Sequence, residues 1–184
     1  MRFRALSVLP LTLLLGAGCD VTSLFQKTTE TVAQKAAEGA AEMALKKQLG
    51  KDVNVDVNKQ GATFTDSSSG RTFAIGEQVT IPSNFPNDIP LNADCVPTSV
   101  SLNTKTSEAA LLCVSVKTPQ DARAWYQTEA IANGWTLNQD QEVMGSFSLS
   151  FTRPEKNGTA KLLINITSGT EGKTNLMIAR SGGE

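Results

Sequence analysis

The sequence offers few side chains that could perform chemistry at neutral pH, and it contains no histidine. A Ser-His-Asp triad and a histidine zinc site are therefore excluded, together with the usual general base. The sequence also has no Gly-x-Ser-x-Gly motif, phosphate-binding loop or dinucleotide fingerprint. Asp140 and Glu142 are close enough in sequence to act as acid and base, but their place near a turn indicates solvated loop charges. We predict a protein that is not an enzyme and that binds no cofactor or metal.

Cys19 follows a segment with the composition of an export signal. Two arginines within the first four residues precede an apolar run over residues 5–15, and small residues lead directly into Cys19. The run is too short to cross a hydrocarbon core of about 30 Å, which needs about 20 helical residues. We therefore predict a signal peptide over residues 1–18 and no permanent transmembrane helix.

The residues before Cys19 resemble the lipobox of bacterial lipoprotein precursors, although Leu15 lies one position earlier than in the commonest form. The resemblance implies that the Cys19 thiol is acylated and that Cys19 becomes the mature N-terminus. Acyl chains anchor a protein stably, because each buried methylene contributes about 0.8 kcal/mol. The implied location is the cell envelope, at the inner or outer membrane, facing the periplasm or the exterior. The alternative is an ordinary secretory signal that precedes a free cysteine.

Cys95 and Cys113 are the two other cysteines of the chain. An exported protein enters a compartment where disulfides persist. A hairpin centred near Thr104, between strands over residues 98–103 and 109–117, would place the two cysteines opposite one another. We therefore predict a disulfide, against the alternatives of free thiols or a two-cysteine metal site. The even-numbered apolar positions should form the buried face and the cysteines the opposite face; these positions are Val100, Leu102, Leu112, Val114 and Val116.

The charge balance argues against a nucleic-acid partner. Without the two arginines of the signal peptide, 15 of the 17 basic residues remain against 18 acidic residues, a mature net charge of 15 − 18 = −3. The chain has no basic stripe of the kind that binds nucleic acid. The predicted partners are the membrane, through the lipid anchor, and an envelope protein or glycan.

The chain after Cys19 divides into four predicted segments. Residues 19–50 should form a helical stalk, because alanine is frequent and proline is absent; a helix that pairs with another copy or lies on the membrane is the alternative. Residues 51–81 alternate in polarity as a small β-meander does, including a last strand over 78–81. Residues 82–94 contain repeated prolines and form an extended connector.

Residues 95–184 carry the clearest pattern. After the hairpin, Thr118 and Pro119 begin a helix that ends near Ala132, with Trp125 and Tyr126 interpreted as core residues. Alternating strands follow, and the predicted order is ββαβββ, with the helix on one face of a mainly antiparallel sheet. The fold class is therefore α+β. Residues 81–180 resemble the C-terminal part of uncharacterised bacterial lipoproteins, a resemblance that implies architecture and location but no chemistry.

These features favour a membrane-tethered envelope lipoprotein that acts as a non-catalytic binding or structural module. The alternative is an envelope enzyme or enzyme inhibitor with a cryptic carboxylate or serine site. The two hypotheses differ in what a structure would contain. A pocket with converging carboxylates would favour catalysis, whereas an exposed sheet face or an apolar groove would favour binding.

Overall fold

The structure is a computed structural model, and it describes residues 35, 38–40, 42–44, 52–58 and 60–182. The predicted signal peptide, Cys19 and most of the predicted stalk lie outside these residues, while those described between 35 and 44 are helical. The chain divides into two compact units, residues 1–36 and 37–184, and the description below concerns the second. Among the residues described, no helix has the length and apolar character needed to span a membrane.

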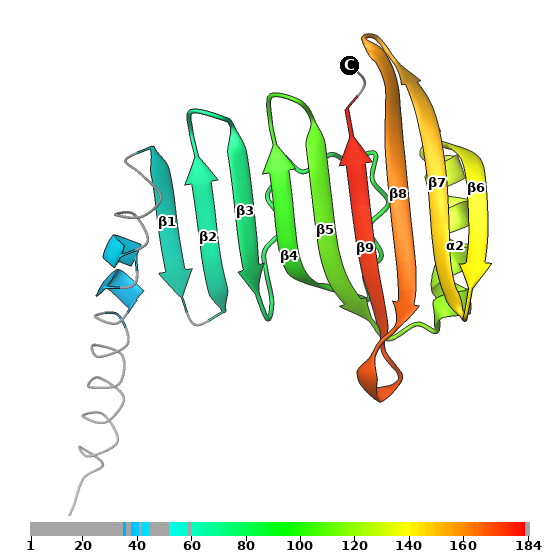
Figure 1. Cartoon of the computed structure of the whole chain (residues 1–184), viewed down its shortest axis with the longest axis horizontal. Coiled ribbons are helices and arrows are strands. Elements are labelled where there is room, and N and C mark those ends of the chain that lie inside the picture. Colours follow the sequence, from blue (N-terminus) through cyan, green and yellow to red (C-terminus); the bar gives the residue numbers. More distant parts are fainter. Residues whose placement is uncertain (1–34, 36–37, 41, 45–51, 59, 183–184) are drawn as a thin grey trace, which may run out of the picture. The chain divides into compact units, whose positions relative to one another are not determined.

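Within residues 52–58 and 60–182, nine antiparallel strands form one sheet (Figure 1), in the order β1-β2-β3-β4-β5-β9-β8-β7-β6. The strands are β1 (Val53–Asn58), β2 (Gly61–Asp66), β3 (Arg71–Gly76), β4 (Cys95–Asn103), β5 (Glu108–Ser115), β6 (Thr136–Val143), β7 (Ser146–Glu155), β8 (Gly158–Ser168) and β9 (Thr174–Ser181). A short 3-10 helix, η1 (Thr170–Gly172), lies between β8 and β9. The fold is thus largely β, and the α+β class is correct in outline.

One helix, α2 (Pro119–Ala132), packs on β6, β7 and β8. Thr118 caps it as predicted, since the Thr118 hydroxyl accepts a hydrogen bond from the Asp121 amide at 3.2 Å. The segment that follows α2 forms the full strand β6, so four strands come after the helix. The predicted order ββαβββ is therefore corrected to ββαββββ.

The meander and the C-terminal strands share the same sheet, because β3 pairs with β4 from Arg71↔Asn103 to Ile75↔Ser99. Residues 78–81 do not form the predicted strand. They begin the connector instead, and the Val79 amide donates a hydrogen bond to the Pro97 carbonyl at 3.0 Å. The connector then crosses the face of the sheet that α2 covers, where Phe85 and Ile89 are buried.

The β4–β5 hairpin has a different register from the predicted one. Ser107 adopts a positive φ of 55° in the turn, and Val100 pairs with Leu111 rather than with an even-numbered residue. A change of one residue in register exchanges the two faces of a strand. Leu111 is consequently fully buried and Leu112 is 43% exposed, so the predicted burial of Leu112, Val114 and Val116 is wrong.

The predicted cysteine pair is nevertheless present. A bulge between Pro97 and Ser99 shifts the register, so that Cys95 pairs with Ser115 and lies on the same face as Cys113. The two sulfur atoms are at disulfide distance, and the Cα atoms are 5.6 Å apart. Cys113 is only 2% exposed and belongs to the core, which corrects the prediction that the cysteines lie opposite the buried face.

Candidate functional site

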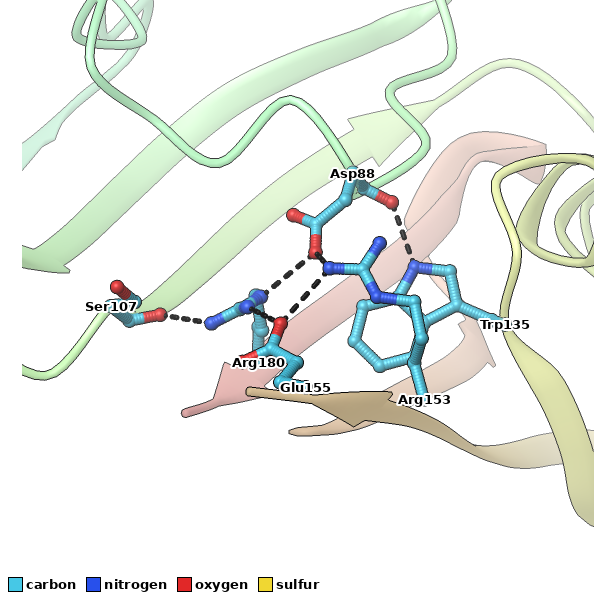
Figure 2. Close-up of polar contacts among 6 residues, drawn as sticks. All are labelled: Asp88, Ser107, Trp135, Arg153, Glu155 and Arg180. Carbon is cyan, nitrogen blue, oxygen red and sulfur yellow. Dashed lines mark hydrogen bonds and ion pairs between the residues drawn. The ribbon is translucent and has the colours of Figure 1, made fainter. Parts of the chain in front are cut away.

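A cluster of four charged side chains fastens the connector to one end of the sheet (Figure 2). Asp88, in the connector, accepts hydrogen bonds from Arg153 of β7 and from Arg180 of β9; the Arg180 Nε distance is 3.1 Å. Glu155, also on β7, accepts from the same two guanidinium groups. We call Asp88, Arg153, Glu155 and Arg180 the Asp88 cluster.

Neutral groups complete the Asp88 cluster. Arg180 Nη1 donates to the Ser107 carbonyl at 2.6 Å, which ties the β4–β5 turn to β9. Trp135 Nε1 donates to the Asp88 carbonyl at 2.8 Å, while the Arg153 guanidinium lies over the Trp135 ring at 4.7 Å from its centre. These residues come from the connector, the β4–β5 turn, the position before β6, and strands β7 and β9. Figure 2 shows their polar groups pointing toward one another.

The Asp88 cluster has the properties of a structural clamp. Its two guanidinium groups balance its two carboxylates, and the Arg180 side chain is only 6% exposed. Each carboxylate lies between two guanidinium groups, which leaves neither as an obvious proton acceptor for a substrate. A cavity of about 590 Å³ adjoins the cluster, but Asp88, Arg153 and Arg180 line it through groups that already pair with one another.

The prediction of solvated loop charges is wrong in placing Asp140 and Glu142 in a loop; the Asp140 side chain is 21% exposed, whereas Glu142, at 55%, is largely solvated. Both lie in β6, and both interact with Arg123 of α2. Asp140 Oδ2 accepts from Arg123 Nη2 and from Gln127 Nε2, each at 2.6 Å. The hydrogen bond with Asp140 raises the pKa of the Arg123 guanidinium, and this pairing fastens α2 to the edge strand. Although the two carboxylates converge, they do so on a cation rather than on an open pocket.

Asp66 is the other carboxylate with a distinct environment. It accepts hydrogen bonds from the hydroxyls of Ser68 and Ser69 in the β2–β3 turn, each at 2.6 Å. These bonds hold the pKa of the Asp66 carboxyl well below its usual range. Asp66 therefore stabilises a turn. Within the described ranges, no group of three or more Cys, Asp or Glu residues could hold a metal ion.

The prediction that Trp125 and Tyr126 belong to the core is correct for Tyr126. Tyr126 is fully buried, and burial raises the pKa of its phenol. Trp125 is partly buried and packs on the core with its ring edge-on to Tyr126 at 4.7 Å. One side of Trp125 borders a cavity of about 410 Å³ between the connector and α2.

The face of the sheet opposite α2 carries a continuous uncharged band. Strand pairing aligns a first row of residues across six strands: Phe64, Phe73, Ser101, Ala110, Ala179 and Leu163. A second, adjacent row runs parallel to it: Ala62, Ile75, Ser99, Leu112, Met177 and Asn165. We call this side of the sheet the open face and these two rows the open band.

The open band exposes more apolar surface than scattered side chains would. Phe73, Ile75 and Leu112 are 41%, 50% and 43% exposed, and Leu163 and Met177 are each 37% exposed. In the middle of the band, the side chains of Ser101, Ala110 and Ala179 are small, and the face is hollowed there by a depression of about 640 Å³. Contiguous apolar patches of this kind are typical of interaction sites.

Sequence reasoning did not identify the open band, because membership depends on strand register. The alternation in β1–β3 was visible, but the side of the sheet to which Phe73 and Ile75 point follows from the pairing of β3 with β4. The Asp88 cluster was also missed, since Asp88 and Arg180 are 92 residues apart.

Comparison with known proteins adds no assignment to this geometry. No protein-family model matches the chain, and no curated protein matches it.

Proposed function

We propose that this chain is a membrane-tethered, non-catalytic lipoprotein of the bacterial cell envelope that binds a partner through the open face of its sheet. The tether would be acyl chains on Cys19, as the resemblance of the N-terminal residues to a lipobox implies. The observation that carries the binding role is the open band, which runs across six strands without a charged side chain.

The contrast between the two faces of the sheet supports this role. Helix α2 and the connector cover one face, where Leu111, Leu162 and Ile178 are completely buried. The open band on the other face contains five large apolar side chains that are at least 37% exposed. Covering apolar surface stabilises an assembly by about 25 cal/mol per Å². An exported module with such a face gains free energy by binding a partner there.

The charged groups support a binding role over a catalytic one. The carboxylates that converge in the described part of the chain do so on arginines, Asp88 and Glu155 on Arg153 and Arg180, and Asp140 and Glu142 on Arg123. Such pairs join elements of the fold to one another. The rigid scaffold that they produce suits a module whose sheet presents a fixed surface.

Photo-crosslinking in intact cells tests the binding role. A photoreactive amino acid replaces Leu112 on the open band, and, in a matched control, Ile131, which is 56% exposed on α2. We expect irradiation to give a discrete higher-mass adduct for position 112 and none for position 131. Adducts at both positions, or at neither, would contradict binding through the open face.

Metabolic labelling tests the tether. Cells that express the full chain should incorporate radiolabelled palmitate into it, and Cys19→Ala should abolish the label because the acceptor thiol is gone. Cys95→Ala/Cys113→Ala is the control and should keep the label. Equal labelling of the Cys19→Ala protein would show that Cys19 is not the lipid carrier.

A further inference from the structure

We propose that the partner of the open face is a second copy of this chain, and that the two sheets pack face to face about a twofold axis parallel to their strands. This inference rests on the proposed function, because it names the occupant of the same surface. The pattern of large, small and charged residues on the open face carries it.

A twofold axis of this kind sets a fixed correspondence between the two copies. If it passes between β4 and β5, which are the middle strands of the open band, β2 of one copy faces β8 of the other. By the same rotation β3 faces β9, and β4 faces β5. Each contact then occurs twice, as it must in an isologous dimer.

This correspondence places large side chains over small ones. Phe73 of one copy faces Ala179 of the other, and Ser101 faces Ala110, over the depression of about 640 Å³. Phe64 meets Leu163, and in the second row Ile75 meets Met177. The phenyl ring of Phe73 is 41% exposed in one chain, and the hollow of the other chain has room for it.

The charges that border the open band fit the same correspondence. The next row toward one end of the strands contains Asp66 on β2, Arg71 on β3, Glu108 on β5 and Lys161 on β8. The rotation sets Asp66 opposite Lys161, which have opposite signs. Arg71 on β3 of one copy faces β9 of the other copy. Glu108 of that other copy lies on β5, the strand next to β9.

The size of the face suits a modest dimer. Neighbouring strands are about 4.8 Å apart and same-face residues along a strand about 7 Å apart, so six strands and three rows span roughly 29 by 20 Å. The resulting area of roughly 600 Å² per chain approaches the 800 Å² per partner of a standard interface. Two sheets with the same twist pack with their strands at about −30°.

The symmetry is also compatible with two tethered chains. A rotation about an axis parallel to the strands leaves equivalent ends of the two sheets on the same side. Two copies that are both anchored through Cys19 can therefore pair while their anchors remain in one membrane. An axis perpendicular to the strands, also in the plane of the interface, would direct equivalent ends in opposite directions.

Engineered cysteines test this arrangement. In the full chain with Phe73→Cys and Ala179→Cys together, mild oxidation of the membranes should give a covalent dimer on a non-reducing gel, and each single variant is the matched control. Positions 73 and 179 are three strands apart on one sheet, so a disulfide within one chain is excluded because it needs Cα atoms closer than about 7 Å. We expect at least tenfold more covalent dimer in the double variant than in either single variant.

Two further outcomes separate this inference from the proposed function. Ala179→Arg should remove the homodimer adduct formed by the photoreactive residue at position 112, with Ile131→Arg as a control that retains it. Suppose that position 112 gives an adduct whose mass is not that of two chains, and that the double variant gives no covalent dimer. This result would overturn the inference that the partner is a second copy, but it would leave binding through the open face intact. The absence of any adduct together with the absence of a dimer would overturn both.

Discussion

At the scale of single residues, the Asp88 cluster shows how charged groups with little solvent exposure can join separate elements of a fold. Arg180 is held by Asp88, Glu155 and the Ser107 carbonyl, so its hydrogen bonds join the connector, the end of β7 and a hairpin turn. Removal of Arg180 would leave Asp88 and Glu155, which are 12% and 25% exposed, sharing the single positive charge of Arg153. Loss of one member of a largely buried charge network costs more than the pairs themselves contribute.

We expect Arg180→Met to lower the free energy of unfolding by about 3–5 kcal/mol, because Asp88 and Glu155 would lose one of their two guanidinium partners. Urea denaturation of the full chain measures the change. Lys156→Met is the control: Lys156 is exposed in the β7–β8 turn, and its loss should cost less than about 0.5 kcal/mol. A change for Arg180→Met no larger than that of the control would mean that the cluster is not a clamp.

Tyr126 gives a second test at this scale, since it is the only tyrosine of the chain. Burial raises the pKa of its phenol, so the folded protein should bind that proton beyond the usual value of about 10. The neutral phenol therefore contributes stability that is complete below pH 10 and is lost as the pH rises toward the folded pKa. An ultraviolet absorbance titration should show the Tyr126 phenolate only when the protein unfolds. Reversible ionisation of Tyr126 near pH 10 in the folded protein would contradict its burial.

At the scale of elements, the β4–β5 hairpin decides which residues reach the core. The turn shifts the pairing by an odd number of residues from the predicted hairpin, since Val100 pairs with Leu111, and the bulge shifts it by one residue. Cys95 and Cys113 meet because of both irregularities. The polarity pattern of β5 alone favours the wrong face, since Leu112, Val114 and Val116 are more apolar than Cys113 and Ser115, the residues between them.

Neighbouring leucines of β5 test this register directly. Leu111→Ala should lower the free energy of unfolding by about 2–5 kcal/mol, because Leu111 is completely buried. Leu112→Ala, a matched change one residue away on the open face, should cost less than about 1 kcal/mol. Urea denaturation measures both changes. A larger loss of stability in Leu112→Ala than in Leu111→Ala would mean that Leu112 is on the buried face, as simple alternation predicts.

The covalent link in this hairpin should be a large part of its stability. Cys95→Ala/Cys113→Ala opens a loop with a sequence separation of 18 residues. On the chain-entropy model this should lower the free energy of unfolding by about 3 kcal/mol. Wild-type protein in a reducing agent is the control and should lose a similar amount. Unchanged stability on reduction, with both thiols then free to alkylate, would show that the pair does not brace the fold.

At the scale of the whole molecule, β3 and β4 join the meander to the C-terminal strands through a continuous ladder. The sequence divides these parts at the connector, whereas the structure places them in one sheet. The connector closes over the covered face through Phe85 and Ile89. In the described part of the chain, the open band of β2–β5, β8 and β9 is an apolar surface on which the chain can meet other molecules, whereas at β1 the same face is covered, since Val55 is 2% exposed.

A shared sheet predicts one cooperative unfolding transition. Both tryptophans, Trp125 and Trp135, lie in the C-terminal part, so their fluorescence reports that part alone. Far-ultraviolet circular dichroism reports all strands, including β1–β3. The two urea curves should coincide. An earlier transition by circular dichroism would mean that the meander unfolds on its own.

The sequence by itself determined the features that depend on neighbouring residues. The cap of α2 at Thr118 and the strands β7, β8 and β9 are confirmed, because capping and alternation act within a few residues, whereas the full strand β6 was not predicted. The pairing of Cys95 with Cys113 is confirmed as well. The lipid anchor at Cys19 stays a prediction. Only the tertiary structure decided the register of β5, the single sheet, the Asp88 cluster and the open band. These depend on one-residue shifts and on contacts between distant residues, which local preference does not fix.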